Sequence, residues 1–148
     1  MFEVQPVRSR ELQEELAKLF GVPMFENTYA FFAADMTSDA AQITGILGLC
    51  QFEYHPDHAA IKSIAAAPGK KDDEAIFVMV RTVMSFCSRA GIPDISAIPE
   101  TEVSGETVDS CELINDIKFI NSLGFREKSD YTIDLNKFYR SPCHYKDE

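Results

Sequence analysis

Residues 59–98 read AAIKSIAAAPGKKDDEAIFVMVRTVMSFCSRAGIPDISAI, and they predict a strand, a helix and a second strand in succession. The run 59–67 is mostly apolar, as expected of a buried strand. The acidic residues 72–74 open a helix whose apolar side chains recur at helical spacing until Gly91. Residues 94–98 favour a short strand. This order indicates an α/β unit.

The residues before this unit predict a helix and several strands. Ser9 offers a hydroxyl that can cap the helix, and Gly21 provides its stop. Strands are expected over residues 2–7, 29–34 and 43–54, and a hairpin turn at 55–58 joins the last of them to the strand at 59–67.

The residues after the unit predict one more helix, a last strand and a tail. Asp109 or Ser110 is expected to cap the helix, and Gly124 to end it. Its apolar residues are Leu113, Ile117, Ile120 and Leu123. Residues 131–135 favour a strand, and we expect the polar stretch 136–148 to be a mobile tail.

The length of 148 residues and the 45% of hydrophobic residues suit one domain with its own core. Helices alternate with strands around a central meander. We therefore predict a single α/β domain over residues 1–135, built on a twisted mixed sheet of about six or seven strands. Phe31 and Phe32 are adjacent in a strand and must point to opposite faces, which fits helices on both faces of the sheet.

The charge balance excludes two classes of partner. Asp and Glu total 24 against 14 Lys and Arg, and the formal net charge is −10. Nucleic acid and anionic membrane surfaces both require clustered cations, which this sequence lacks. We expect neither as a partner.

The cysteines and the first residues favour a cytoplasmic protein. The four cysteines, Cys50, Cys87, Cys111 and Cys143, are widely spaced, and we expect free thiols. The first residues lack the basic and apolar regions of a signal peptide. No apolar run approaches the ~20 residues that cross a bilayer.

Two segments, Ile61–Pro68 and Phe119–Phe125, give the sequence a resemblance to a known family. IKSIAAAP looks like the central strand, and FINSLGF like the end of the last helix, of the GNAT superfamily of acyl-CoA-dependent N-acetyltransferases. The order and spacing of the elements support the resemblance from Phe2 to about Leu135.

The resemblance implies acetyl-CoA or another acyl-CoA as co-substrate. The pantetheine arm would lie along the backbone of Ile64, Ala65 and Ala66, and Lys70 and Lys71 would stand near the pyrophosphate. The acceptor would be a small-molecule amine or a peptide amine. Members of the family are often dimers, so a homodimer is a further expectation.

Two positions depart from the family pattern. The loop before the long helix has no glycine where the family has two, and Asp72, Asp73 and Glu74 stand at the helix start. Carboxylates there complement the helix dipole but repel a diphosphate. Ile120 stands where the family often has a tyrosine that protonates the leaving thiolate.

Glu53 is the candidate general base, because it is the one acid on an otherwise mostly apolar strand. The alternative is that Glu53 is an exposed strand residue. The sequence His55-Pro-Asp-His58 offers too few ligands for zinc, which needs three or four, and we interpret it as a turn without a metal.

The sequence is compatible with two functions. The first is an N-acyltransferase in which an amine attacks the thioester directly. The second is a GNAT-like protein without catalytic activity that binds a partner or another ligand and does not use CoA.

Overall fold

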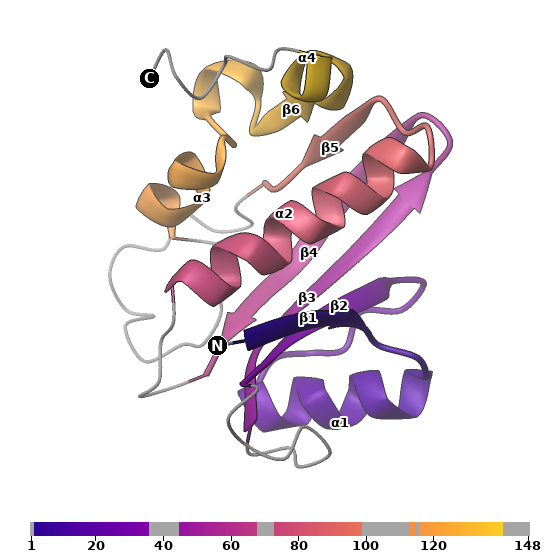
Figure 1. The fold of residues 1–148 in the computed structure, drawn as a ribbon, viewed down its shortest axis with the longest axis vertical. Coiled ribbons are helices and arrows are strands. Elements are labelled where there is room, and N and C mark those ends of the chain that lie inside the picture. Colours follow the sequence, from indigo (N-terminus) through magenta and orange to yellow (C-terminus); the bar gives the residue numbers. More distant parts are fainter. Residues whose placement is uncertain (1, 36–44, 68–72, 99–112, 115, 141–148) are drawn as a thin grey trace.

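A six-stranded sheet runs through the molecule, and its strands lie side by side in chain order from β1 to β6 (Figure 1). The computed structural model describes residues 2–35, 45–67, 73–98, 113–114 and 116–140. The strands are β1 Phe2–Pro6, β2 Tyr29–Asp35, β3 Ile46–His55, β4 His58–Ala66, β5 Asp94–Ser96 and β6 Thr132–Asp134. The helices are α1 Arg10–Phe20, α2 Asp73–Arg89, α3 Ile117–Leu123 and α4 Leu135–Arg140, with a short 3₁₀ turn, η2, at Glu127–Ser129.

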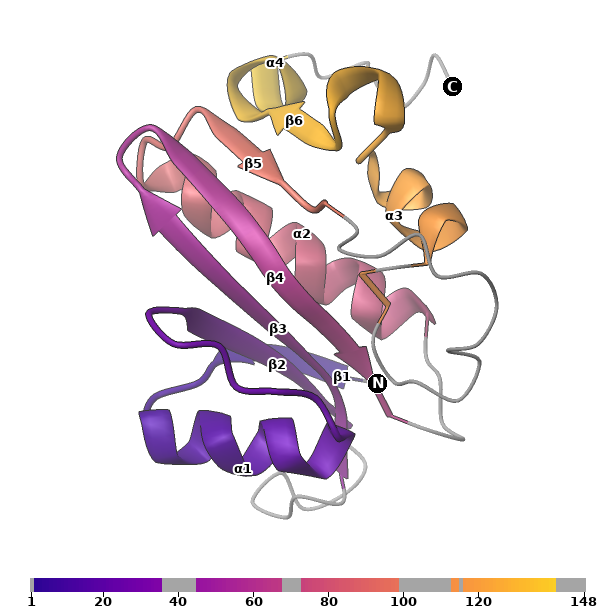
Figure 2. The same cartoon turned by 180° about the vertical axis from the view of Figure 1, so that it is seen from behind.

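The sheet is mixed, as predicted. β4 and β5 run parallel, whereas the other neighbouring strands pair antiparallel. The parallel pairing is short: Ala59 lies beside Ile95 and Ala60 beside Ser96, and β4 then continues to Ala66 paired with β3 but without β5. The sheet therefore opens between these two strands, as both views show (Figures 1 and 2).

Helices cover both faces of the sheet, which confirms the prediction (Figure 2). α2 packs on one face, called here the α2 face, over a large core that also receives α3 side chains. α1 packs on the other face, the α1 face, over a smaller core. Phe31 packs against the first core and Phe32 against the second, so the two rings point in opposite directions as expected.

The caps of α1 follow the sequence prediction. The Ser9 hydroxyl accepts a hydrogen bond from the Leu12 amide (3.1 Å), and Gly21 ends the helix with a φ of 70°. Such a left-handed φ is strained for residues other than glycine.

The predicted start of the last long helix is wrong. α3 begins at Ile117, because the Asp116 carboxylate accepts a hydrogen bond from the Phe119 amide (3.1 Å) and caps the helix there. Leu113 therefore lies before the helix, although it is buried. Asp109 and Ser110 lie outside the described residues.

Residues 136–140, where the sequence predicted the start of a tail, belong to α4. Phe138 packs against the core on the α2 face, and its ring centroid lies 4.5 Å from the guanidinium carbon of Arg81. Residues 141–148 lie outside the described part of the chain.

Two of the predicted free thiols are in the core. Cys50 and Cys87 are buried and form no disulfide. Burial raises the pKa of Cys87 to about 11, because desolvation penalises the thiolate. Cys87 therefore packs in the core, as the sequence indicated. Cys111 and Cys143 lie outside the described residues.

Gly48 allows α2 to approach β3 closely. A methyl group at this position would lie against Ile76 Cδ1 and 3.0 Å from the carbonyl oxygen of Ala65. Gly48→Ala is expected to lower the free energy of unfolding by about 1–3 kcal/mol, the usual cost of overpacking. Urea denaturation measures this loss.

Ile76→Val provides the control, because it removes the Cδ1 atom that the new methyl group would meet. Gly48→Ala should cost less in the Ile76→Val background than in the wild type. Equal costs in the two backgrounds would show that this contact is not the constraint.

Candidate functional site

The opening between β4 and β5 holds a small cavity of about 140 Å³. Its walls come from the two strands on either side, from the segment that follows β5 and from a residue before α3. The described lining residues are Ala60, Ile61, Lys62, Ser96, Ile98 and Ile114. The cavity therefore lies where the parallel pairing ends and the strands diverge.

The predicted cofactor-binding residues of β4 lie along this opening, and other parts of the chain cover them. Ile64 and Ala65 are fully buried and Ala66 is 5% exposed. The Leu113 amide donates a hydrogen bond to the Ile64 carbonyl over 2.7 Å. The chain's own backbone thus bonds to β4 where the resemblance places pantetheine.

The start of α2 is acidic, as predicted. Asp73 and Glu74 occupy its first turn and are exposed. Their carboxylates lie next to the positive end of the helix dipole. Lys70, Lys71 and Asp72 lie outside the described residues.

Glu53 reaches the α1 face of the sheet. Its neighbours in β3, Phe52 and Tyr54, pack against Phe86 of α2, so Glu53 points to the opposite face. Its cross-strand partner is Ala60, a residue of the cavity wall. The candidate base therefore lies on β3, one strand away from the cavity.

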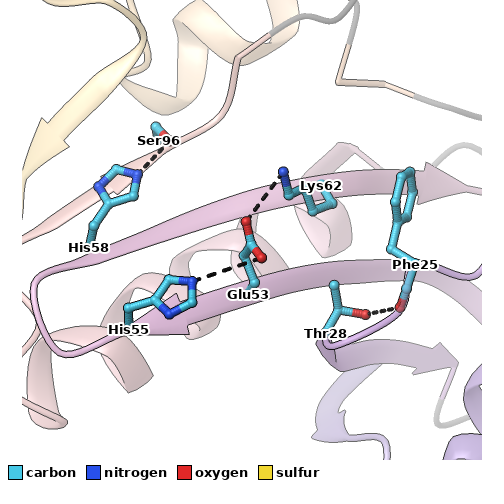
Figure 3. Close-up of polar contacts among 7 residues, drawn as sticks. All are labelled: Phe25, Thr28, Glu53, His55, His58, Lys62 and Ser96. Carbon is cyan, nitrogen blue, oxygen red and sulfur yellow. Dashed lines mark hydrogen bonds and ion pairs between the residues drawn. The ribbon is translucent and has the colours of Figure 1, made fainter.

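An ion pair holds the Glu53 carboxylate. Lys62 Nζ lies 3.3 Å from Glu53 Oε1, and His55 Nε2 lies 3.9 Å from Oε2 (Figure 3). The Glu53 side chain is 30% exposed, so solvent also reaches it. The Lys62 ammonium therefore lies beside the Glu53 carboxylate in a partly exposed ion pair.

The sequence did not reveal a second polar pair, His58 and Ser96. His58 Nε2 lies 3.2 Å from Ser96 Oγ, where His58 is the first residue of β4 and Ser96 the last of β5 (Figure 3). Ser96 is 3% exposed and lines the cavity. The residues are 38 positions apart, and no local motif links them.

Gln51 anchors the α1–β2 connection, residues 21–28, over the α1 face. Its Oε1 accepts hydrogen bonds from Gln13 Nε2 (2.9 Å) and the Phe25 amide (3.0 Å), and its Nε2 donates to the Pro23 carbonyl (3.0 Å). Thr28 closes the same connection by donating its hydroxyl to the Phe25 carbonyl over 2.6 Å (Figure 3). This buried network was not predicted, because glutamine in a strand gives no sequence signal.

Ile120, which stands at the position expected for a tyrosine, is fully buried in the core on the α2 face. It contributes packing and offers no proton. Any proton for a leaving group at the cavity must come from other residues.

Two further observations concern metal ions and membranes. Among the described residues, no three His, Cys, Asp or Glu side chains come close enough to hold a metal ion. Within the same residues, no helix has the length and apolar character needed to span a bilayer.

Similar solved structures share this architecture, although their sequences have diverged. A proposed acetyltransferase from Exiguobacterium sp. 255-15 matches with a TM-score of 0.57 and 14% identity, over 96% of this chain and 99% of that one. An aminoglycoside 6′-N-acetyltransferase complexed with coenzyme A matches with a TM-score of 0.54 and 11% identity, over 82% and 83% of the two chains.

A third match is partial. A GNAT family acetyltransferase from Elizabethkingia anophelis with acetyl-CoA bound matches over 64% of this chain and 62% of its own length, with 12% identity and a TM-score of 0.43. The matched region thus spans less than two thirds of that protein. No protein-family model and no curated protein sequence matches the chain.

The chain is therefore an α/β domain whose mixed sheet opens between its two parallel strands. It has the GNAT fold, as the resemblance implied. At these identities the matches establish the fold, and the function has to be argued from the site.

Gln51→Leu tests the role of the buried amide. The change leaves the Phe25 amide and the Pro23 carbonyl without this partner, so the free energy of unfolding should fall by about 1–3 kcal/mol. Amide hydrogen exchange over residues 21–28 should become faster. Gln5→Leu, at a half-buried glutamine on β1 whose side-chain amide bonds to the Glu3 side chain, is the matched control and should change both quantities much less.

Proposed function

We propose that this protein is an acyl-CoA-dependent N-acyltransferase that transfers an acetyl group, or another acyl group, to an amine. The observation that carries the proposal is the opening of the sheet between β4 and β5. A cavity lies at its apex, and Glu53 stands one strand away on β3, where it pairs with Ala60 of the cavity wall.

The β4 edge suits the amide groups of a pantetheine arm. The Ile64 carbonyl accepts a backbone N–H in the structure, so its orientation suits an amide donor from outside. Ile64, Ala65 and Ala66 would hold the arm, and Lys70 and Lys71 would stand near the pyrophosphate. The bound acyl-CoA supplies a thioester as the acyl donor.

Glu53 is the proposed general base. It would take the proton that the amine loses on attacking the thioester, and Lys62 would keep its carboxylate in place. Direct transfer needs little beyond orientation and an unprotonated amine.

The proposed acceptor is a small-molecule or peptide amine. One solved structure of similar fold is an aminoglycoside 6′-N-acetyltransferase, which supports a small-molecule amine as acceptor. The net charge of −10 favours the approach of a cation. The proposed setting is the cytoplasm, and a homodimer is part of the proposal.

Two observations favour a second candidate function, a binding protein that does not use CoA. Leu113 bonds to β4 at the pantetheine edge, and carboxylates stand at the start of α2. A separate cavity of about 680 Å³ lies between the β1–α1 loop and the α1–β2 connection, with Arg8, Arg10 and Glu26 in its lining. It could serve as the ligand site of such a protein.

Calorimetry with acetyl-CoA separates the two candidates. A transferase should bind acetyl-CoA with a micromolar Kd and release CoA thiol when an aminoglycoside, a polyamine or a lysine peptide is added. Glu53→Gln should keep this Kd and lower kcat by about 100-fold, the usual contribution of a general base. Glu127→Gln, at an exposed turn, is the matched control.

Absence of heat and of thermal stabilisation at millimolar acetyl-CoA would exclude the transferase and favour the binding protein. Turnover that Glu53→Gln leaves unchanged would keep the transferase and remove Glu53 as its base.

Leu113→Pro tests whether the Leu113 amide competes with the co-substrate. Proline has no N–H, so the bond to the Ile64 carbonyl is lost while an apolar side chain remains. If acyl-CoA must displace a hydrogen bond with a net value of about 1 kcal/mol, its affinity should rise about fivefold in this variant.

Leu113→Ala keeps the amide donor and is the control for the lost side chain. Equal CoA affinities of the proline and alanine variants, measured by calorimetry, would show that the amide does not compete.

A further inference from the structure

We propose that Ser96 is a catalytic residue that delivers a proton to the leaving thiolate, and that His58 resupplies this proton. The inference rests on the proposed acyl transfer. It assigns a role to the His58–Ser96 pair, which lies outside the predicted site.

The position of Ser96 points to the leaving group. Its hydroxyl belongs to a residue that is 3% exposed and lines the cavity at the apex of the opening. Of the other five described lining side chains, four are apolar, namely Ala60, Ile61, Ile98 and Ile114. The remaining one, Lys62, is held by Glu53 over 3.3 Å. Among the described residues of this wall, Ser96 is therefore the one that offers a hydroxyl donor to a sulfur atom.

The backbone holds Ser96 in place. β5 pairs with β4 on one side, where Ser96 lies beside Ala60, and with β6 on the other, where it lies beside Thr132. Ile95 is buried in the core on the α2 face, so Ser96 points to the α1 face, as Glu53 does. The proposed base and the proposed proton donor thus share one face of the sheet.

His58 connects Ser96 to solvent. Its Nε2 lies 3.2 Å from Ser96 Oγ, and its side chain is half-buried at the start of β4. A serine hydroxyl alone is a weak acid, but an imidazolium in hydrogen-bond contact can replace its proton in the same event. His58 is a relay residue, because it acts through Ser96 and does not touch the sulfur.

In the proposed step the amine nitrogen forms a bond to the acyl carbon, and Glu53 takes the proton that the nitrogen loses. The bond between acyl carbon and sulfur breaks, and its electron pair stays on sulfur. Ser96 gives its hydroxyl proton to the sulfur, and the Nε2–H of protonated His58 restores the serine hydroxyl. Glu53 then releases its proton to solvent and His58 takes one up from solvent, so that both residues return to their starting states.

Three variants test the assignment with acetyl-CoA and the best amine of the panel. Ser96→Ala should lower kcat by about 100-fold, with the Kd of acetyl-CoA changed by less than about twofold. Ser96→Thr keeps the hydroxyl in a residue that strands accept, and it should recover most of the lost rate. His58→Gln should lower kcat and leave the Kd of acetyl-CoA unchanged. Ser129→Ala, at an exposed serine, is the matched control.

A binding measurement provides a readout besides activity. Free CoA presents its thiol to Ser96, so Ser96→Ala should weaken CoA binding about fivefold, the value of one hydrogen bond, and acetyl-CoA binding less. A purely structural role would change both affinities together and would lower the melting temperature.

The outcomes separate the proposed function from this inference. If the wild type turns over and Ser96→Ala behaves as Ser129→Ala does, the transferase stands and the role of Ser96 is overturned. If the wild type binds neither acetyl-CoA nor CoA, the transferase fails and the role of Ser96 fails with it. Loss of rate in Ser96→Ala without recovery in Ser96→Thr also overturns the proton transfer.

Discussion

The short parallel pairing of β4 with β5 is the constraint on which the candidate site depends. Two residue pairs, Ala59 with Ile95 and Ala60 with Ser96, join the strands, and β4 then runs on to Ala66 without β5. Backbone groups left at a strand edge need partners, because an unpaired buried group is costly. The Leu113 amide supplies one of them, at the Ile64 carbonyl. The cavity, the candidate cofactor edge and the His58–Ser96 pair all border this opening.

Local sequence signals predicted most of the elements, because they depend on neighbouring residues. Ser9 and Gly21 cap α1 as expected. The adjacent rings of Phe31 and Phe32 predicted that both faces of the sheet are covered, and each ring packs against a different core. The start of α3 was not predictable in the same way. Leu113 fits the apolar spacing of the helix, but its backbone bonds to Ile64 instead, and that contact spans 49 positions of the chain.

The site was predictable in part. Glu53 was selected because an acid is unusual on an apolar strand, and the structure places it on β3, one strand away from the cavity. Its ion pair with Lys62 follows from a cross-strand contact, which one sequence does not reveal. His58 was interpreted as a turn residue, and it does begin a strand directly after the turn. Its bond to Ser96 depends on the parallel register of β4 and β5, and this register is set by the whole sheet.

The contact between Leu113 and Ile64 also bears on the behaviour of the protein in concentrated solution. A strand with free backbone donors and acceptors is a template on which another chain can add a strand, and exposed edges of this kind promote aggregation. Because the Leu113 amide already bonds to the Ile64 carbonyl, this acceptor on the edge of β4 is not offered to another chain. A ligand that replaces Leu113 would take over this protection, so the opening would be shielded from other chains in both states.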